Sequence, residues 1–339
     1  MRSRIVFLGS LAFVIASAAA GTTAVHAQSA SPPAAKVEFI TVEPDVKLEV
    51  LDWGGPRDGS KARPLVFLAG LGDTAHVYDG FAPQFTAENH VYGITRRGFG
   101  NSSKPAPTDA NYSADRLGED VLAVIGALHL NRPVLAGHSI AGEELSWMGT
   151  RHPEKVAGLI YLDAADAYGF YDSVRGDTQI DLLDVKERLD RFRAGAVYDR
   201  AFVDGLRASV AQLNRDLDAE QMRLAEMPDV PAPPAPPAIP LAAWFGMEKF
   251  TKIDAPAMAI FACPHDMSPM FRGPLANDPM AQASIRAFDM QRCTDQSNAF
   301  ERAMPADPVV RIANANHHIF VSNPDEVARA MRDFMAKLQ

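Results

Sequence analysis

The sequence predicts an α/β protein with a doubly wound, mostly parallel sheet and an inserted helical lid. Short continuous apolar runs alternate with segments of helical periodicity, as expected for strands buried on both faces. One of these runs, residues 134–136, leads through Gly-His-Ser-Ile-Ala straight into a helical segment. Between residues 164 and 252 the alternation stops, and amphipathic helices rich in both charges replace it.

Composition and charge limit the classes of partner. The 339 residues are 47% hydrophobic and 22% charged, which is typical of a globular protein with a full core. A net charge of −9 leaves no basic face to neutralise phosphates, so we expect no nucleic-acid partner. We expect a small-molecule substrate, and the sequence leaves the oligomeric state open.

The N-terminal residues predict export. Arg2 and Arg4 precede the apolar run 5–20, and a Val-His-Ala cleavage pattern ends at residue 27. The apolar run is short for a membrane span, so a cleaved signal peptide over 1–27 is favoured over a retained anchor. Residues 28–36 are expected to be a disordered leader. The mature protein should be periplasmic or secreted, without a membrane anchor.

Two cysteines, Cys263 and Cys293, form the only pair in the chain. An oxidising compartment permits a disulfide between them, and closing a loop of about 30 residues would stabilise the fold by ~3–4 kcal/mol. Two separate buried thiols are the alternative.

The first part of the core is predicted over residues 37–163. An antiparallel hairpin at 37–41 and 48–53 opens it, because apolar and polar residues alternate there. The elements that follow are strands at 64–69, 90–94 and 156–162, besides the run before Ser139, and helices at 76–85, 112–128 and 143–151, with Ser113 as a helix cap.

The lid is predicted over 164–252 and the rest of the core over 253–339. The lid helices are expected at 181–193, 201–227 and 241–250, with a Pro/Ala spacer at 228–240. The core resumes with strands at 255–261 and 308–312, a long loop that holds both cysteines, and a closing helix at 325–338.

Ser139 is the candidate nucleophile. It lies at the tip of a strand-turn-helix bend in which Gly137 and Ala141 must be small for the two backbones to approach. The start of the following helix directs free amides and a positive dipole end at the same place. This arrangement suits attack of a serine hydroxyl on a carbonyl carbon.

A serine nucleophile needs a base and a carboxylate that orients the base. Asp266 follows the strand at 255–261, and His317 follows the strand at 308–312. The order Ser, Asp, His is the one expected for a parallel sheet of this type. Asp163 also ends a strand and is the alternative acid.

Four stretches carry a resemblance to a known family: the elbow at 137–141, the Gly-rich loop at 69–72, the loop at 97–102 and the segment 316–325. With these motifs the chain resembles the α/β-hydrolase superfamily over nearly everything after residue 36. Members often place the catalytic histidine seven residues before a proline, which selects His317 over His318. The resemblance favours Asp266 over Asp163, because the loop of Asp266 usually faces the histidine.

The resemblance also implies an oxyanion hole made by the backbone amides of Leu71 and Ile140. Two departures from the family pattern are Ala141 in place of glycine, and Ala69 where many members carry histidine. The substrate pocket is expected to be apolar and to include Tyr168, Phe170, Tyr171, Trp244, Phe245, Met267, Met270 and Phe320.

These residues predict an exported serine hydrolase that cleaves carboxylic esters through an acyl-enzyme, with no cofactor and no metal. Because the base must be neutral, activity should fall as the pH drops through roughly 6–7. The same triad could instead act on lactone, amide or carbon–carbon bonds.

The rival hypothesis is an NADP-dependent oxidoreductase. Residues 70–75 fit G-x-G-x-x-A after a strand, and Arg96 and Arg97 lie where a 2′-phosphate could bind. Predicted export and the otherwise unexplained serine elbow count against it.

Overall fold

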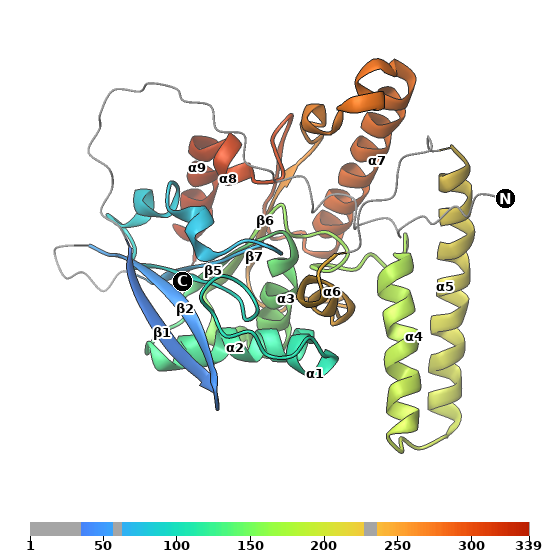
Figure 1. The fold of residues 1–339 in the computed structure, drawn as a ribbon, viewed down its shortest axis with the longest axis horizontal. Coiled ribbons are helices and arrows are strands. Elements are labelled where there is room, and N and C mark those ends of the chain that lie inside the picture. The colour runs from blue at the N-terminus through green and yellow to red at the C-terminus, as the bar shows by residue number, and fades with distance from the viewer. Residues whose placement is uncertain (1–34, 57–62, 227–235, 339) are drawn as a thin grey trace.

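The computed structural model describes residues 35–56, 63–226 and 236–338 (Figure 1). The predicted signal peptide at 1–27 lies outside the described residues, as do most of the leader and of the Pro/Ala spacer. Over the described ranges, every helix is too short or too polar to cross a bilayer.

The described residues form one sheet of eight strands in the order β1-β2-β4-β3-β5-β6-β7-β8. The β1–β2 and β2–β4 pairs are antiparallel, and the five remaining pairs are parallel. The predicted mostly parallel α/β sheet is therefore confirmed. The strands are β1 Lys36–Glu43, β2 Val46–Gly54, β3 Leu65–Leu68, β4 Val91–Ile94, β5 Val134–His138, β6 Gly158–Leu162, β7 Ala257–Ala262 and β8 Val309–Ile312.

Helices cover both faces of this sheet. In β3, Val66 and Leu68 belong to the apolar cluster that includes residues of α2, α3 and α7. Their neighbours Leu65 and Phe67 belong to a second cluster, which includes residues of α9. Successive side chains of a strand point to opposite faces, so one continuous apolar run serves both layers. The helices are α1 Asp109–Tyr112, α2 Ala114–Ala127, α3 Gly142–Arg151, α4 Thr178–Arg193, α5 Arg200–Glu226, α6 Ala238–Phe245, α7 Pro279–Ala303, α8 Ile319–Ser322 and α9 Pro324–Met335.

Two predicted elements are wrong in detail. The helix expected at 76–85 is a pair of short 3₁₀ helices, Ala75–Tyr78 and Ala82–Phe85, the second with a proline in its first turn. The long loop expected around Cys293 is instead the 25-residue helix α7. Its apolar residues do not gather on one side, so the sequence shows no amphipathic period there.

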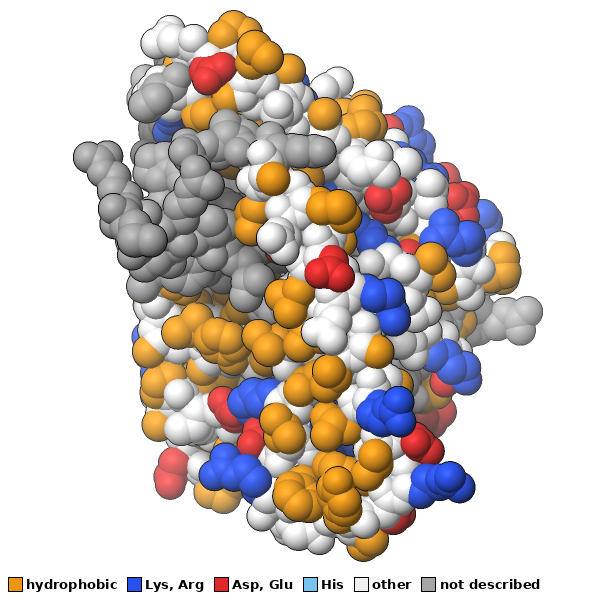
Figure 2. Space-filling view, turned by 90° about the vertical axis from the view of Figure 1, so that its right-hand side faces the viewer, with side chains coloured by type: hydrophobic (Ala, Val, Ile, Leu, Met, Phe, Trp, Pro, Cys, Tyr) orange, Lys and Arg blue, Asp and Glu red, His pale blue; other side chains and the backbone are white. Residues whose placement is uncertain are grey.

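Three helices, α4, α5 and α6, lie between β6 and β7, where the helical lid is predicted. Figure 1 shows α4 and α5 side by side as a hairpin that projects from the body of the molecule. Figure 2, viewed from that side, shows exposed apolar side chains interspersed with charges of both signs. The large exposed apolar residues of the hairpin are Leu182, Leu189, Phe192, Val197, Tyr198, Val210, Leu217 and Met222.

Cys263 and Cys293 form a disulfide with a Cα–Cα distance of 5.5 Å. It joins the end of β7 to the middle of α7 and resolves the alternative of two separate thiols.

Candidate active site

The serine elbow has the predicted geometry. Ser139 directly follows β5, and its φ of +53° is a left-handed value that side chains rarely adopt. A Cβ added to Gly137 would lie 3.1 Å from the Ala141 carbonyl oxygen, so the strand and the next turn approach as closely as expected. The strained bend places the Ser139 side chain at the carboxyl edge of the sheet, in a 3₁₀ turn that leads into α3.

The structure brings Ser139 and His317 together. The serine Oγ lies 2.9 Å from His317 Nε2, although 178 residues separate them. On the other side of the ring, His317 Nδ1 lies 2.6 Å from Asp163 Oδ2. These two contacts form a continuous Ser-His-Asp chain of hydrogen bonds.

The acid in this chain is Asp163, and the prediction that Asp266 contacts the histidine is wrong. The Asp266 side chain is partly exposed and accepts a hydrogen bond from the Ser268 amide. Its loop does approach the histidine loop, because the Asp266 amide bonds the Ala315 carbonyl, but the side chain does not reach His317. Asp163 has a φ of +49°, and its carboxylate is buried against the ring.

His265 and Asp289 extend the chain beyond Asp163, and sequence reasoning missed both. His265 Nε2 lies 2.8 Å from Asp163 Oδ2, and His265 Nδ1 lies 2.7 Å from Asp289 Oδ1. The second oxygen of Asp289 accepts the His265 amide at 2.8 Å. The one sequence signal was the adjacent pair His265-Asp266 in the loop after β7. Asp266 was predicted to act in the site, whereas His265 is the residue that contacts Asp163.

Burial and charge act in opposite directions on these groups. Burial lowers the pKa of His265. The negative charges of Asp163 and Asp289 and their hydrogen bonds with His265 have the larger effect and raise the pKa to about 10. Burial raises the pKa of Asp163, but His265 and His317 outweigh it and hold the pKa well below its usual value. Asp163 is therefore ionised across the neutral pH range.

The loop before the elbow lies against the nucleophile. A Cβ on Gly70 would lie 2.7 Å from His138 Nδ1 and 3.3 Å from Ser139 Cβ, so a larger residue would force the loop or the His138 ring to move. The Gly70 carbonyl accepts from buried Arg96, which also pairs with Glu144 at 2.6 Å. Leu71, next in the chain, packs against the apolar cluster that includes Ile140.

The predicted pocket residues divide between the site and its surroundings. Tyr168 lies nearest the reacting groups: together with Asp163, His265 and His317 it lines a cavity of about 30 Å³. Burial raises the Tyr168 pKa, and a hydrogen bond with the Ser139 side chain lowers it by less. Trp244, from α6, packs in one cluster with Tyr168, Tyr171 and Ile140. The segment between β6 and β7 thus covers the residue next to the nucleophile.

The remaining pocket candidates do not line this cavity. Phe170 packs against Phe300, with ring centres 5.7 Å apart, inside the core. Phe320 packs at 4.6 Å against Tyr78 in the other core layer. Met267 is buried outside the cavity lining, Met270 is partly exposed, and Phe245 is 45% exposed.

Two sets of side chains in the described residues bring possible metal-binding atoms within 4.8 Å of one another. In one set, His318 Nε2 bonds Asp73 at 2.9 Å, and His138 Nδ1 lies 3.8 Å from the same carboxylate oxygen. The other set is Asp163, His265 and His317, which belong to the chain of hydrogen bonds that begins at Ser139. In that set the nitrogens and the shared oxygen already bond one another, so these contacts account for their closeness without an ion.

The arginines of the rival hypothesis are paired elsewhere. Arg97 is fully buried and binds both oxygens of Asp120 at 2.6 Å, besides Glu43. Arg96 pairs with Glu144, as described above. The Gly-rich loop leads into one turn of 3₁₀ helix, whereas a dinucleotide fingerprint opens a full helix. These residues do not fit a 2′-phosphate site.

Comparison with known proteins agrees with the fold. A family model described as "Alpha/beta hydrolase family" matches residues 65–330. The chain is 32% identical to a fluoroacetate dehalogenase of Burkholderia sp. over 118 residues, 34% of this chain and 39% of the relative. It is 26% identical to a putative non-heme haloperoxidase of Mycobacterium phage D29 over 112 residues, 33% of this chain and 40% of the relative. These matches thus span about two fifths of each relative.

Among solved structures, E-2-(acetamidomethylene)succinate hydrolase superposes with a TM-score of 0.53 at 16% identity. The match covers 89% of this chain and 99% of that one. At this identity the likeness concerns the fold alone.

Proposed function

Because the chain belongs to the alpha/beta hydrolase family, we propose that it is a serine hydrolase that cleaves carboxylic esters through an acyl-enzyme. The observation that carries the proposal is the 2.9 Å contact between Ser139 Oγ and His317 Nε2, backed by Asp163 at 2.6 Å. The names of the relatives span dehalogenation and peroxidation, so they do not select the reaction. The serine at the elbow supports acyl transfer, because an elbow serine with a base in reach is suited to attack a carbonyl carbon.

In the proposed reaction, His317 takes the proton of Ser139 while Oγ bonds to the ester carbonyl carbon. The carbonyl oxygen becomes an oxyanion held by the amides of Leu71 and Ile140. When this intermediate collapses, the bond to the alcohol oxygen breaks and His317 returns the proton to the leaving alcohol. Water then attacks the acyl-serine by the same route and releases the acid. Asp163 stabilises the imidazolium in both steps.

Lactones and amides react by the same steps, so they are the alternative substrates of this site, together with carbon–carbon bonds beside a carbonyl. Members of this superfamily that act on haloalkanes or epoxides use an aspartate nucleophile, whereas this chain has Ser139 at that position. The paired arginines argue against the oxidoreductase alternative.

Export to the periplasm or the medium belongs to the proposal too. Its support is the leader composition together with the Cys263–Cys293 disulfide, since disulfides persist in oxidising compartments. Mass analysis of the N-terminus of the secreted or periplasmic protein tests it, and a mature chain that retains Arg2 and Arg4 would contradict it.

A fluorophosphonate probe tests the reaction, because it labels only an activated serine. We expect labelling at Ser139 and turnover of p-nitrophenyl acyl esters, both abolished in Ser139→Ala with the fold intact. Ser173→Ala, at an exposed serine, is the matched control and should leave both unchanged. A panel of esters, lactones and amides then ranks the substrates. The proposal would be refuted if the Ser139→Ala variant turned over esters at the wild-type rate.

A further inference from the structure

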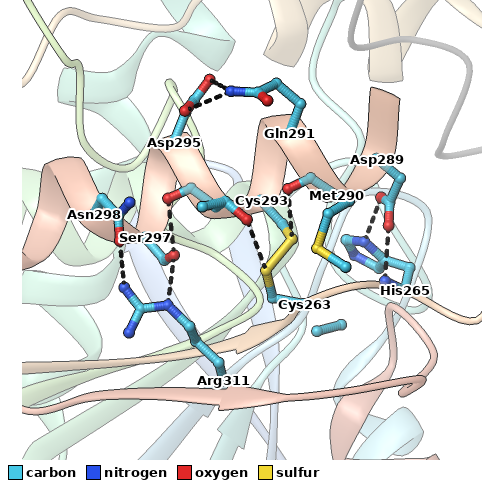
Figure 3. Close-up of a disulfide and its surroundings, with 12 residues drawn as sticks. Cys263, His265, Asp289, Met290, Gln291, Cys293, Asp295, Ser297, Asn298 and Arg311 are labelled. Carbon is cyan, nitrogen blue, oxygen red and sulfur yellow. Dashed lines mark hydrogen bonds and ion pairs between the residues drawn. A yellow bond between two sulfur atoms is a disulfide. The ribbon is translucent and has the colours of Figure 1, made fainter. Parts of the chain in front are cut away.

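The hydrogen-bonded chain does not end at the acid. Asp163 Oδ2 accepts from two rings, His317 at 2.6 Å and His265 at 2.8 Å, while its other oxygen accepts the Ala262 amide at 2.9 Å. An ordinary triad needs only the first of these contacts. Asp289, from α7, holds His265 in turn: one carboxylate oxygen contacts the ring Nδ1, and the other accepts the backbone amide of His265 (Figure 3).

His265 is an imidazolium on geometric grounds. Each of its ring nitrogens faces a carboxylate oxygen, and a carboxylate can only accept. A neutral imidazole has one N–H, so it would leave one nitrogen lone pair facing an anion. Only the protonated ring donates to Asp163 and Asp289 together. All three groups are buried, and the set Asp163, His265, Asp289 carries a net charge of −1.

The cation has two effects on the acid. It keeps a buried carboxylate ionised, which burial alone would oppose, and it fixes the direction of Oδ2 toward His317. It also places a positive charge near the base, since the two ring centres are 6.2 Å apart. A unit charge about 6 Å away shifts a pKa by about one to two units in a protein interior. The other ionisable groups around His317 and Asp163 are His138, Asp166, Tyr168, Arg292 and His318.

The disulfide joins the two segments that carry this pair. Cys263 lies two residues before His265, and Cys293 lies one helical turn after Asp289. Figure 3 shows the sulfur bridge beside the His265–Asp289 contact, between the β7 loop and α7. Without it, noncovalent contacts alone would hold the loop against the helix.

We propose that His265 and Asp289 form a positioning unit that holds Asp163 ionised and directed at His317, and that the Cys263–Cys293 disulfide keeps this unit assembled. The inference rests on the proposed function for its catalytic consequence. Neither residue touches the substrate; both act through Asp163.

The test follows two readouts across pH: the rate of fluorophosphonate labelling, and the histidine titrations by NMR in uniformly ¹⁵N-labelled protein. In the wild type we expect His265 to stay protonated to pH 9 or above. His265→Gln keeps a donor toward Asp163 but removes the charge, so the His317 titration and the acid limb of labelling should rise by about one to two pH units. Asp289→Asn should lower the His265 titration by at least about one unit and slow labelling about tenfold or more.

Asp266→Asn is the matched control, because it makes the same change one residue from His265 on a carboxylate outside the chain. It should leave the labelling rate and both titrations unchanged. Thermal melts establish that each variant is folded, and the wild-type His265 titration decides the charge assignment even if a variant fails to fold. A wild-type His265 that titrates near pH 6.5, or a His265→Gln profile that coincides with that of Asp266→Asn, would overturn the positioning unit.

Dithiothreitol tests the disulfide part. Reduction of the wild type should lower the His265 titration and slow labelling several-fold, whereas a Cys263→Ser, Cys293→Ser double variant should already be slow and insensitive to the reductant. An unchanged titration after complete reduction would contradict the role of the disulfide. Because the titrations need no turnover, a wild type that the probe does not label refutes the proposed function alone, and the His317 shift in His265→Gln still decides the positioning unit.

Discussion

Replacing Asp163 by asparagine tests most directly which acid serves His317. The substitution keeps the size of the side chain and removes the charge that lies 2.6 Å from His317 Nδ1 and 2.8 Å from His265 Nε2. Two opposite charges about 4 Å apart interact by about 4 kcal/mol at an effective dielectric constant of about 20. Since the imidazolium forms only as the reaction proceeds, this energy is lost from the transition state.

We therefore expect kcat/KM for a p-nitrophenyl ester to fall about 10³-fold in Asp163→Asn. Asp266→Asn should change it less than about twofold, because that carboxylate bonds Ser268 and does not contact His317. The assay compares both variants with the wild type at pH 8, with thermal melts to confirm folding. If Asp163→Asn keeps kcat/KM within threefold, or if Asp266→Asn falls as far, the assignment of the acid is wrong.

Three further predictions concern neighbouring residues. His317→Ala should abolish ester turnover, whereas His318→Ala should retain it within about tenfold, and equal losses in the two would contradict the assignment of the base. The pKa of His265 is about 10 in the folded protein against 6.5 in the unfolded chain. Protonation of His265 therefore stabilises the fold by a contribution of order 5 kcal/mol, which is complete below pH 6.5 and is lost as the pH rises through 10. Urea unfolding at pH 6, 8 and 10.5 should show a stability difference between wild type and His265→Gln that shrinks with pH, and a constant difference would count against the charge. Gly70→Ala would place a Cβ 2.7 Å from the imidazole before the nucleophile and displace the oxyanion loop, so kcat should fall about 10- to 100-fold. Gly80→Ala, where a Cβ meets nothing within 4 Å, should not change kcat, and equal effects of the two would argue against a displaced loop.

The parts of the site that could be predicted are the local ones. Ser139 lies in a turn whose flanking residues must be small, and the five consecutive residues 137–141 meet this requirement. The sheet could be predicted as well, because strands buried on both faces appear as continuous apolar runs such as β3 and β7. A histidine after the last strand could be predicted from its position, and the family resemblance selected His317 over His318.

The part that could not be predicted is the choice between two carboxylates that both follow strands. Asp163 and Asp266 have the same kind of neighbourhood in the sequence, and their side-chain directions differ only in three dimensions. A positive φ turns Asp163 inward, while the loop of Asp266 directs His265 inward instead. Helix α7, which brings Asp289 to that histidine, has no apolar periodicity and was expected to be a loop.

By itself, the sequence determined the parallel sheet, the strained serine bend and the histidine that follows the last strand. Only the tertiary structure decided which acid holds the histidine and that a second histidine and aspartate stand behind that acid. The physical reason is that backbone periodicity and turn chemistry are properties of neighbouring residues. A buried hydrogen-bonded chain of charges depends instead on where segments more than 100 residues apart meet.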